Sequence, residues 1–550
     1  MNTPILEVQD LLVRAHLDEG PRTLIDNVSL TLERGEILGL VGESGSGKSL
    51  LCRSVLKLMP APSLRIDGGV VRLGDRDLTQ ASEREMQQVR GGSIGMIFQN
   101  PTSHLDPLMR VGDQIAEGVG YHRNVAPRAA RMAAVDILRQ VGFPDPERQR
   151  YGYPHEFSGG MRQRAMIGVA LACEPEILIA DEPTTALDVT IQAQILRLLM
   201  ETRDRRGLSI ILISHDLGVV AQCCDRIAVM RDGRIVEMQE KRALLSAPRH
   251  PYTRDLIASH PSMTNVADAL ASSAEEAPLL EVKDLHVRFP TGAGFLSGLP
   301  QHFDAVRGVS LRVMPSETLG IVGESGSGKS TLARAILGLT PMASGQVRFD
   351  GIEITPAHHA QLRRETAMVF QDPLNALNPR MTVGETLSEV LRIQGGHRDI
   401  PGRVRELLDL VALGPEFLDR KPRSLSGGQC QRVGIARALA VDPKLVIADE
   451  CVAALDVTIQ AQIVELFREL RARIGLTLVF IAHDLAIVRN LCQRVVVMRA
   501  GEIVEEGEAA QVLDRPRHPY TAALLAAIPD IDPDIPFGRS AVEPTEETAT

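Results

Sequence analysis

The sequence predicts two tandem α/β domains, each built around a sheet of mainly parallel strands. At 550 residues the chain is too long for one ordinary hydrophobic core. The string Val-Gly-Glu-Ser-Gly-Ser-Gly-Lys-Ser occurs twice, at 41–49 and 322–330. Short apolar runs rich in Ile, Val and Leu are typical of strands buried on both faces of a parallel sheet. Such runs end at Asp181 and His215 in the first half and at Asp449 and His483 in the second.

The composition is that of a soluble globular protein, with 44% hydrophobic and 24% charged residues. A net charge of −10 argues against non-specific nucleic-acid binding, which needs a cationic surface. We expect no signal peptide, and no apolar run approaches the ~18–20 residues that a membrane span requires. Seven cysteines without a C-x-x-C pair fit a reducing compartment.

Each repeated string fits the phosphate-binding pattern G-x-x-x-x-G-K-[ST] and lies between a strand-like and a helix-like segment. Glycines allow backbone N–H groups to approach phosphates, and the helix N-terminus adds a positive dipole. The lysine would neutralise phosphate oxygens, and the last serine would offer its hydroxyl to Mg²⁺. The predicted nucleotide-binding residues are Gly42, Glu43, Ser44, Gly45, Ser46, Gly47, Lys48 and Ser49, with Gly323, Glu324, Ser325, Gly326, Ser327, Gly328, Lys329 and Ser330 in the second copy.

An Asp-Glu pair follows one apolar run in each half. Asp181 and Asp449 end strands at the edge where open parallel sheets bind ligands, so we expect them to serve Mg²⁺. The next residues, Glu182 and Glu450, point in another direction and can polarise water. An acidic pair at a helix N-terminus is the alternative for either pair alone, and the preceding phosphate loop disfavours it.

A histidine and a Ser-Gly-Gly string each occur at corresponding positions in the two halves of the chain. His215 and His483 each follow the aspartate by 34 residues (215−181 and 483−449), so we interpret them as donors to a γ-phosphate rather than as structural residues. A Ser-Gly-Gly precedes a helix-like stretch in each half, where Ser caps the helix and Gly leaves N–H groups open to an anion. This second anion site makes sense if it contacts a nucleotide held by the other half; its residues are Ser158, Gly159, Gly160, Ser426, Gly427 and Gly428.

With these motifs the chain resembles the ATP-binding subunits of ATP-binding-cassette (ABC) transporters, with two cassettes fused between about Leu6 and Ile528. The resemblance implies two P-loop NTPase cassettes, each with an antiparallel β subdomain and a helical subdomain beside its core sheet. It implies head-to-tail pairing, with each ATP between one phosphate loop and the opposite Ser-Gly-Gly. The implied catalytic residues are Glu182, Glu450, His215, His483 and the Q-loop glutamines Gln99 and Gln371; the implied Mg²⁺ ligands are Ser49, Gln99, Asp181, Ser330, Gln371 and Asp449.

Segments 98–107 and 370–379 and the His-Pro-Tyr-Thr strings at 250–253 and 518–521 resemble those of peptide, nickel and glutathione importers. This resemblance implies an ATPase, with ATP and Mg²⁺ as cofactors, that energises import of peptides or a related small solute. The implied partners are two membrane-spanning permease subunits and an extracytoplasmic solute-binding protein, with no nucleic acid. The implied location is peripheral, on the cytoplasmic face of the bacterial plasma (inner) membrane.

The predicted domains are residues 1–262 and 279–530, joined by a linker at 263–278 and followed by a disordered tail at 531–550. Cassettes of the family stack an aromatic residue on adenine; Phe289 fits in the second half, whereas the first has Ala15-His16. The alternative function is a soluble twin-cassette ATPase acting on ribosomes or DNA. A short acidic linker and a negative net charge disfavour it, and the sequence leaves the transported solute open.

Overall fold

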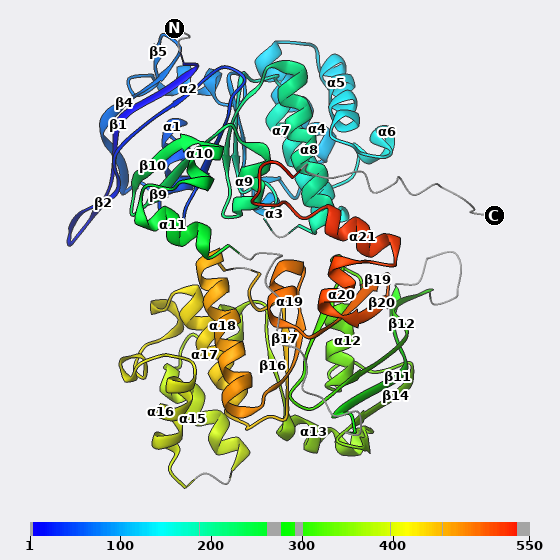
Figure 1. Ribbon diagram of the computed structural model, residues 1–550. Coiled ribbons are helices and arrows are strands. Elements are labelled where there is room, and N and C mark those ends of the chain that lie inside the picture. Colours follow the sequence, from blue (N-terminus) through cyan, green and yellow to red (C-terminus); the bar gives the residue numbers. More distant parts are fainter. Residues whose placement is uncertain are drawn as a thin grey trace. The chain divides into compact units, whose positions relative to one another are not determined.

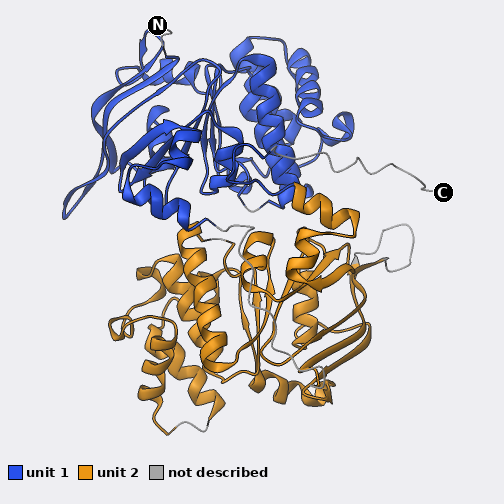
Figure 2. Cartoon of the chain, in the orientation of Figure 1, with its two compact units in different colours: residues 1–260, 527–539 blue, residues 261–526, 540–550 orange. Residues whose placement is uncertain are grey.

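The computed structural model describes residues 4–185, 187–260, 277–291, 301–395, 398–453 and 455–535. The chain divides into two compact units, residues 1–260 with 527–539 and residues 261–526 with 540–550 (Figure 2). Most of the predicted linker at 263–278 and of the predicted tail at 531–550 falls outside the described residues.

The centre of the first unit is a six-stranded sheet in the order β10-β9-β3-β8-β7-β6 (Figure 1). All neighbours from β9 to β6 pair in parallel, and only β10 runs antiparallel to β9. The sheet therefore has the predicted parallel-rich character. Its strands are β3 (Ile37–Val41), β6 (Ile94–Ile97), β7 (Ile177–Asp181), β8 (Ser209–Ile213), β9 (Arg226–Arg231) and β10 (Arg234–Glu240).

A second, antiparallel sheet has the order β2-β1-β4-β5, with strands β1 (Leu6–Leu17), β2 (Gly20–Leu32), β4 (Leu64–Leu73) and β5 (Arg76–Asp77). Helices complete the unit. They are α1 (Lys48–Val55), α2 (Glu83–Val89), α3 (Pro101–His104), α4 (Val111–Arg123), α5 (Pro127–Gln140), α6 (Pro146–Gln149), α7 (Gly159–Leu171), α8 (Val189–Arg206), α9 (Leu217–Cys223), α10 (Lys241–Ser246) and α11 (Pro251–Ala258).

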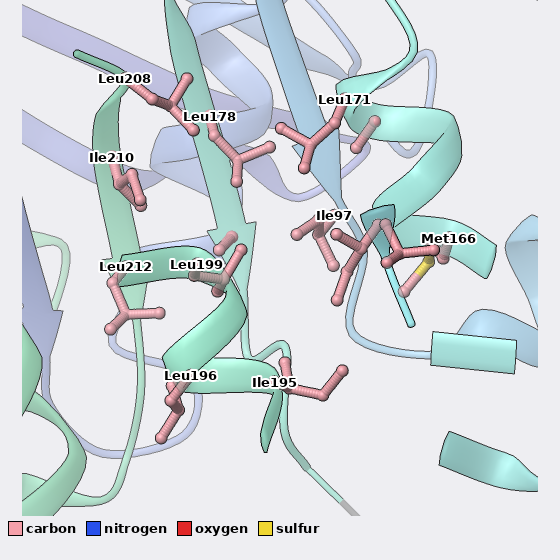
Figure 3. Close-up of a cluster of buried hydrophobic side chains, with 14 of the residues drawn as sticks. Ile97, Met166, Leu171, Leu178, Ile195, Leu196, Leu199, Leu208, Ile210 and Leu212 are labelled. Carbon is pink, nitrogen blue, oxygen red and sulfur yellow. The ribbon is translucent and has the colours of Figure 1, made fainter. Parts of the chain in front are cut away.

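The core sheet is buried on both faces because successive strand residues point to opposite sides. In β7, Leu178 belongs to a cluster with the helices α7 and α8, whereas Ile177 and Ile179 belong to a cluster with the antiparallel sheet and α1. Figure 3 shows part of the helix-side cluster, with Leu178 of β7, Ile210 of β8 and Leu199 of α8 among its labelled residues. Because both faces of the sheet are covered, polar side chains lie at the ends of its strands. The polar residues at the carboxyl ends form the candidate nucleotide site.

The second unit repeats this plan with sheets ordered β20-β19-β13-β18-β17-β16 and β12-β11-β14-β15 (Figure 1). Its strands are β11 (Leu280–Thr291), β12 (Gln301–Val313), β13 (Thr318–Val322), β14 (Ser344–Phe349), β15 (Ile352–Glu353), β16 (Thr366–Val369), β17 (Leu445–Asp449), β18 (Thr477–Ile481), β19 (Arg494–Arg499) and β20 (Glu502–Glu508). Its helices are α12 (Lys329–Ile336), α13 (His359–Glu365), α14 (Pro373–Ala376), α15 (Val383–Gln394), α16 (Ile400–Leu410), α17 (Gly427–Leu439), α18 (Val457–Ile474), α19 (Leu485–Leu491), α20 (Ala509–Asp514) and α21 (Pro519–Ala526).

Residues 527–535 belong to the first unit, where they lie on α9 and α10. The Gln222 side chain donates hydrogen bonds to the carbonyls of Asp530 and Asp532, at 2.9 and 2.8 Å. Arg242 forms an ion pair with Asp534 at 2.6 Å. Ile531 packs against the helix-side core cluster. Within the described ranges, no helix combines the length and apolar character needed to cross a bilayer.

Candidate active sites

Each phosphate loop joins a core strand to the helix that follows it. In the first unit the loop runs from β3 to α1, and Gly42 and Gly47 have φ angles of 147° and 102°. A Cβ atom at Gly42 would lie 2.1 Å from the carbonyl oxygen of Met230, so the backbone approaches β9 too closely for any side chain. Lys48 Nζ donates to the carbonyls of Gly42 and Glu43, at 2.7 and 2.8 Å. These carbonyls hold the ammonium group within the curve of the loop.

The serine and aspartate predicted to hold Mg²⁺ meet in both units. Ser49 Oγ donates to Asp181 Oδ1 at 2.7 Å, and Ser330 makes the same contact with Asp449 at 2.7 Å. Burial raises the pKa of the Asp181 carboxyl, and the hydrogen bond from Ser49 offsets part of this effect. The second oxygen, Oδ2 of Asp181, is buried and has no hydrogen-bond partner among the residues that the structure describes. A hydroxyl and a carboxylate with one oxygen still unpaired are hard oxygen donors of the kind that Mg²⁺ takes, together with substrate phosphates.

Glu182 follows directly after β7 in a left-handed backbone conformation, with φ of 48°. Its carboxylate accepts hydrogen bonds from Gln99 Nε2 at 2.7 Å and from Thr185 Oγ1 at 2.9 Å. His215 Nδ1 lies 3.6 Å away. Burial alone would raise the pKa of Glu182, but the hydrogen bond and charge of His215, with Thr185 and Gln99, lower it to about 2. The carboxylate is therefore ionised at neutral pH and can orient a water molecule.

The second unit brings the corresponding glutamine and glutamate together. Gln371 Nε2 donates to Glu450 at 2.8 Å, and Glu450 also has a left-handed φ, 47°. The Glu450 carboxylate also forms an ion pair with Lys329 Nζ, at 4.0 Å. His483 follows β18 as His215 follows β8. Ala453 stands where the first unit has Thr185, so the hydroxyl donor to the glutamate is missing from this position. Sequence reasoning missed this contact, although the unequal residues three positions after each glutamate were visible in the repeat.

Each Ser-Gly-Gly begins a helix, as predicted. Ser158 caps α7 by accepting a hydrogen bond from Met161 N at 3.4 Å, and Ser426 caps α17 by accepting one from Gln429 N at 3.3 Å. In the second unit the Gln429 side chain accepts a hydrogen bond from Ser426 N at 3.0 Å, which completes a capping box. Met161 has no side-chain oxygen, so the first helix begins with the serine cap alone.

The adenine-stacking candidates differ in exposure. Phe289 lies on β11 and is 40% exposed. Ala15 is buried, and the His16 ring binds Asp67 through Nε2 at 3.1 Å. The two units therefore present different surfaces upstream of identical phosphate loops.

The fold and these sites define a twin P-loop ATPase. The chain matches the family described as ABC transporter at residues 25–185 and 306–453, and the oligopeptide/dipeptide transporter C-terminal region at 236–288 and 504–549. It belongs to the ABC transporter family, and it is an ATP-hydrolysing subunit of an importer. The alternative of a ribosome or DNA factor is not favoured.

Similar proteins span nearly the whole chain. The glutathione import ATP-binding protein GsiA of Escherichia coli O157:H7 is 42% identical over 561 residues, covering 96% of this chain and 90% of the relative. The protein of the same name from Pectobacterium atrosepticum is 42% identical over 569 residues with the same coverage. Among solved structures, a post-hydrolysis dimer of the ATP-binding cassette MJ0796 with ADP and Pi has 30% identity and a TM-score of 0.38, covering 42% of this chain and 98% of that chain.

Proposed function

We propose that this chain energises the import of small peptides, glutathione-type tripeptides included, by hydrolysing MgATP at two sites. In each site a phosphate loop and a Ser-Gly-Gly segment would hold one ATP. The relatives named as glutathione import ATP-binding proteins support the cargo class. We further propose two permease subunits and an extracytoplasmic binding protein as partners, with the chain on the cytoplasmic face of the bacterial inner membrane.

The observation that carries the proposed chemistry is the paired placement of glutamine and glutamate. Gln99 contacts Glu182 at 2.7 Å, and Gln371 contacts Glu450 at 2.8 Å, in two units whose sequences differ around these residues. An ionised carboxylate held beside the strand end can orient water toward a γ-phosphate, and the glutamine can report occupancy of the site to the helical segment that follows it.

Mg²⁺ fits the donors at the strand ends. Ser49 with Asp181, and Ser330 with Asp449, would hold the ion, with Gln99 and Gln371 completing its shell. The unpaired Oδ2 of Asp181 supports this assignment. When bound, the ion would neutralise charge on the β- and γ-phosphate oxygens. His215 and His483 would donate hydrogen bonds to the γ-phosphate, and Lys48 and Lys329 would leave their loop carbonyls for its oxygens.

The catalytic assignment is tested with Glu182→Gln, Glu450→Gln and the double variant in the assembled transporter. Loss of a positioned base costs about 10²–10⁴ in rate, so the double variant should hydrolyse ATP at least about 100-fold more slowly while still binding it. Glu19→Gln, an exposed glutamate on the turn after β1, is the matched control and should leave the rate unchanged. A double variant that hydrolyses ATP at the wild-type rate would refute the assignment.

The cargo is tested separately. The binding protein of the same transporter is purified from cells, and its ligand is identified by mass spectrometry. ATPase of the reconstituted transporter is then measured with glutathione, a dipeptide or a tripeptide. Stimulation by none of these peptides would contradict the proposed cargo class and leave the ATPase assignment standing.

A further inference from the structure

The tyrosine of each His-Pro-Tyr-Thr string touches the phosphate loop of its own unit. Glu43 N donates a hydrogen bond to Tyr252 Oη at 3.0 Å, and Glu324 N donates one to Tyr520 Oη at 3.1 Å. Both tyrosines are buried, with 6% and 8% of the residue exposed. The same contact therefore occurs twice, between segments about 200 residues apart in the chain.

The tyrosine accepts its hydrogen bond from the same peptide group whose carbonyl accepts one from the loop lysine. The Glu43 N–H and the Gly42 carbonyl are the two ends of one planar peptide group. Tyr252 accepts from its N–H, and Lys48 Nζ donates to its carbonyl at 2.7 Å. In the second unit Tyr520 and Lys329 hold the peptide between Gly323 and Glu324 in the same way, with the lysine contact at 2.8 Å. The orientation of this plane thus helps to place the ammonium group, which also donates to the next carbonyl along the loop.

Each tyrosine also contacts an arginine side chain and belongs to a helix that is capped by a histidine. The guanidinium of Arg231 lies 4.8 Å from the centre of the Tyr252 ring, and that of Arg499 lies 5.0 Å from the Tyr520 ring. Both arginines end the strand, β9 or β19, that borders the loop. His250 Nδ1 accepts from Tyr252 N at 3.2 Å, which caps the helix that carries the ring.

A carboxylate anchors the start of that helix. Glu237 of β10 accepts hydrogen bonds from Arg249 N at 2.8 Å and His250 N at 3.0 Å. Glu505 of β20 accepts equivalent bonds from Arg517 N and His518 N, at 2.8 and 3.1 Å. A continuous set of contacts therefore runs from the last sheet strand through the capped helix to the phosphate loop.

We propose that Tyr252 and Tyr520 are positioning residues for ATP binding, which orient the first peptide group of each phosphate loop and through it the loop lysine. This proposal rests on the proposed function and gives the His-Pro-Tyr-Thr segment a role in it. The tyrosine acts on nucleotide affinity. Once ATP is bound, its phosphates hold the lysine, and the hydrolysis step depends little on the tyrosine hydroxyl.

The test removes only the hydroxyls, with Tyr252→Phe, Tyr520→Phe and the double variant in the full chain. A phenylalanine keeps the ring and its contact with arginine but leaves the loop N–H without its acceptor. A lost hydrogen bond of this kind corresponds to about a 3- to 10-fold change in an equilibrium constant. We expect the Kd for MgATP of the double variant to rise by about that factor, with KM rising in parallel and kcat changing less than about twofold.

Tyr121→Phe is the matched control, since Tyr121 is 63% exposed on α4. It should bind MgATP like the wild type. A merely structural role for Tyr252 and Tyr520 would reduce the folded fraction and lower kcat at unchanged KM, and that result would overturn the proposal. Unchanged Kd and KM in the double variant would also overturn it. A wild-type chain that fails to bind MgATP would overturn the proposed function as well, so the two failures are distinguishable.

Discussion

Replacing Glu237 by Gln should destabilise the first unit in a pH-dependent way. The side chain is 8% exposed, and its carboxylate accepts the two backbone N–H groups that begin the α11 segment. Burial alone would raise the pKa of Glu237, but the Thr253 side chain and the N–H groups of Arg249 and His250 outweigh it and lower the pKa to about 2. The folded state therefore favours the ionised form.

The expected magnitude follows from this pKa. A fall from 4.5 to about 2 corresponds to an upper limit of about 3 kcal/mol of stability at neutral pH. Glutamine keeps one acceptor oxygen, so we expect Glu237→Gln to lose about 1–2 kcal/mol of this. Because the pKa is lower in the folded than in the unfolded state, the stabilisation is complete above pH 4.5. It is lost as the pH falls from 4.5 towards 2.

Two measurements check this prediction. Hydrogen exchange detected by mass spectrometry in peptides spanning 247–258 reports the local stability of the segment, and thermal unfolding followed by circular dichroism reports the stability of the whole chain. At pH 7 the variant should exchange faster in this segment and unfold at a temperature lower by about 2–6 °C. The difference from wild type should shrink as the pH falls below 4.5. Glu19→Gln serves as the control. Equal protection of both proteins at pH 7, or a difference that persists undiminished at pH 3, would refute the reasoning.

Three other changes have defined outcomes. Met161→Gln should complete a capping box with Ser158 and raise the unfolding temperature of the first unit, since helix caps contribute about 0.5–2 kcal/mol; an unchanged transition would contradict this. Gly42→Ala should abolish ATP binding to the first loop, because its Cβ would lie 2.1 Å from Met230 O; retained affinity there would refute the close approach. Gln222→Ala should speed exchange in residues 527–535, and equal exchange would show that its two hydrogen bonds do not hold that segment.

Much of the candidate site could be predicted from the sequence because its residues belong to short motifs in which neighbouring positions have fixed spacing. The phosphate loop needs glycines, a lysine and a serine at fixed spacing between a strand and a helix, and the loop at 42–49 provides all of them. Asp181 and His215 were recognisable because buried strands are short apolar runs, and the residue after such a run lies at the ligand-binding edge. The parallel-rich sheet followed from the same runs.

The features that the sequence did not predict depend on contacts between segments that are far apart in the chain. The sequence shows the His-Pro-Tyr-Thr string at 250–253, but nothing local indicates that Tyr252 meets Glu43, which lies 209 residues earlier. That contact exists because β9 borders β3 in the sheet, which brings the chain after β10 back to the loop. The left-handed conformation of Glu182 is equally invisible in sequence, since such backbone angles are uncommon outside glycine and are imposed by surrounding structure.

Any kinetic difference between the two sites must arise outside the phosphate loops. The loops are identical in sequence, and their lysine contacts agree within 0.1 Å, at 2.7 and 2.8 Å to the first carbonyl. The glutamates are held differently. Glu182 receives a hydroxyl from Thr185, a residue whose counterpart is Ala453, and its pKa falls to about 2. Each additional hydrogen-bond donor restricts the orientation of a carboxylate. It also stabilises the ionised form, which lowers the pKa and makes the carboxylate a weaker base. Under the proposed catalytic role, the hydroxyl that Glu182 receives from Thr185 is therefore one source of a difference between the two sites in how the glutamate orients water.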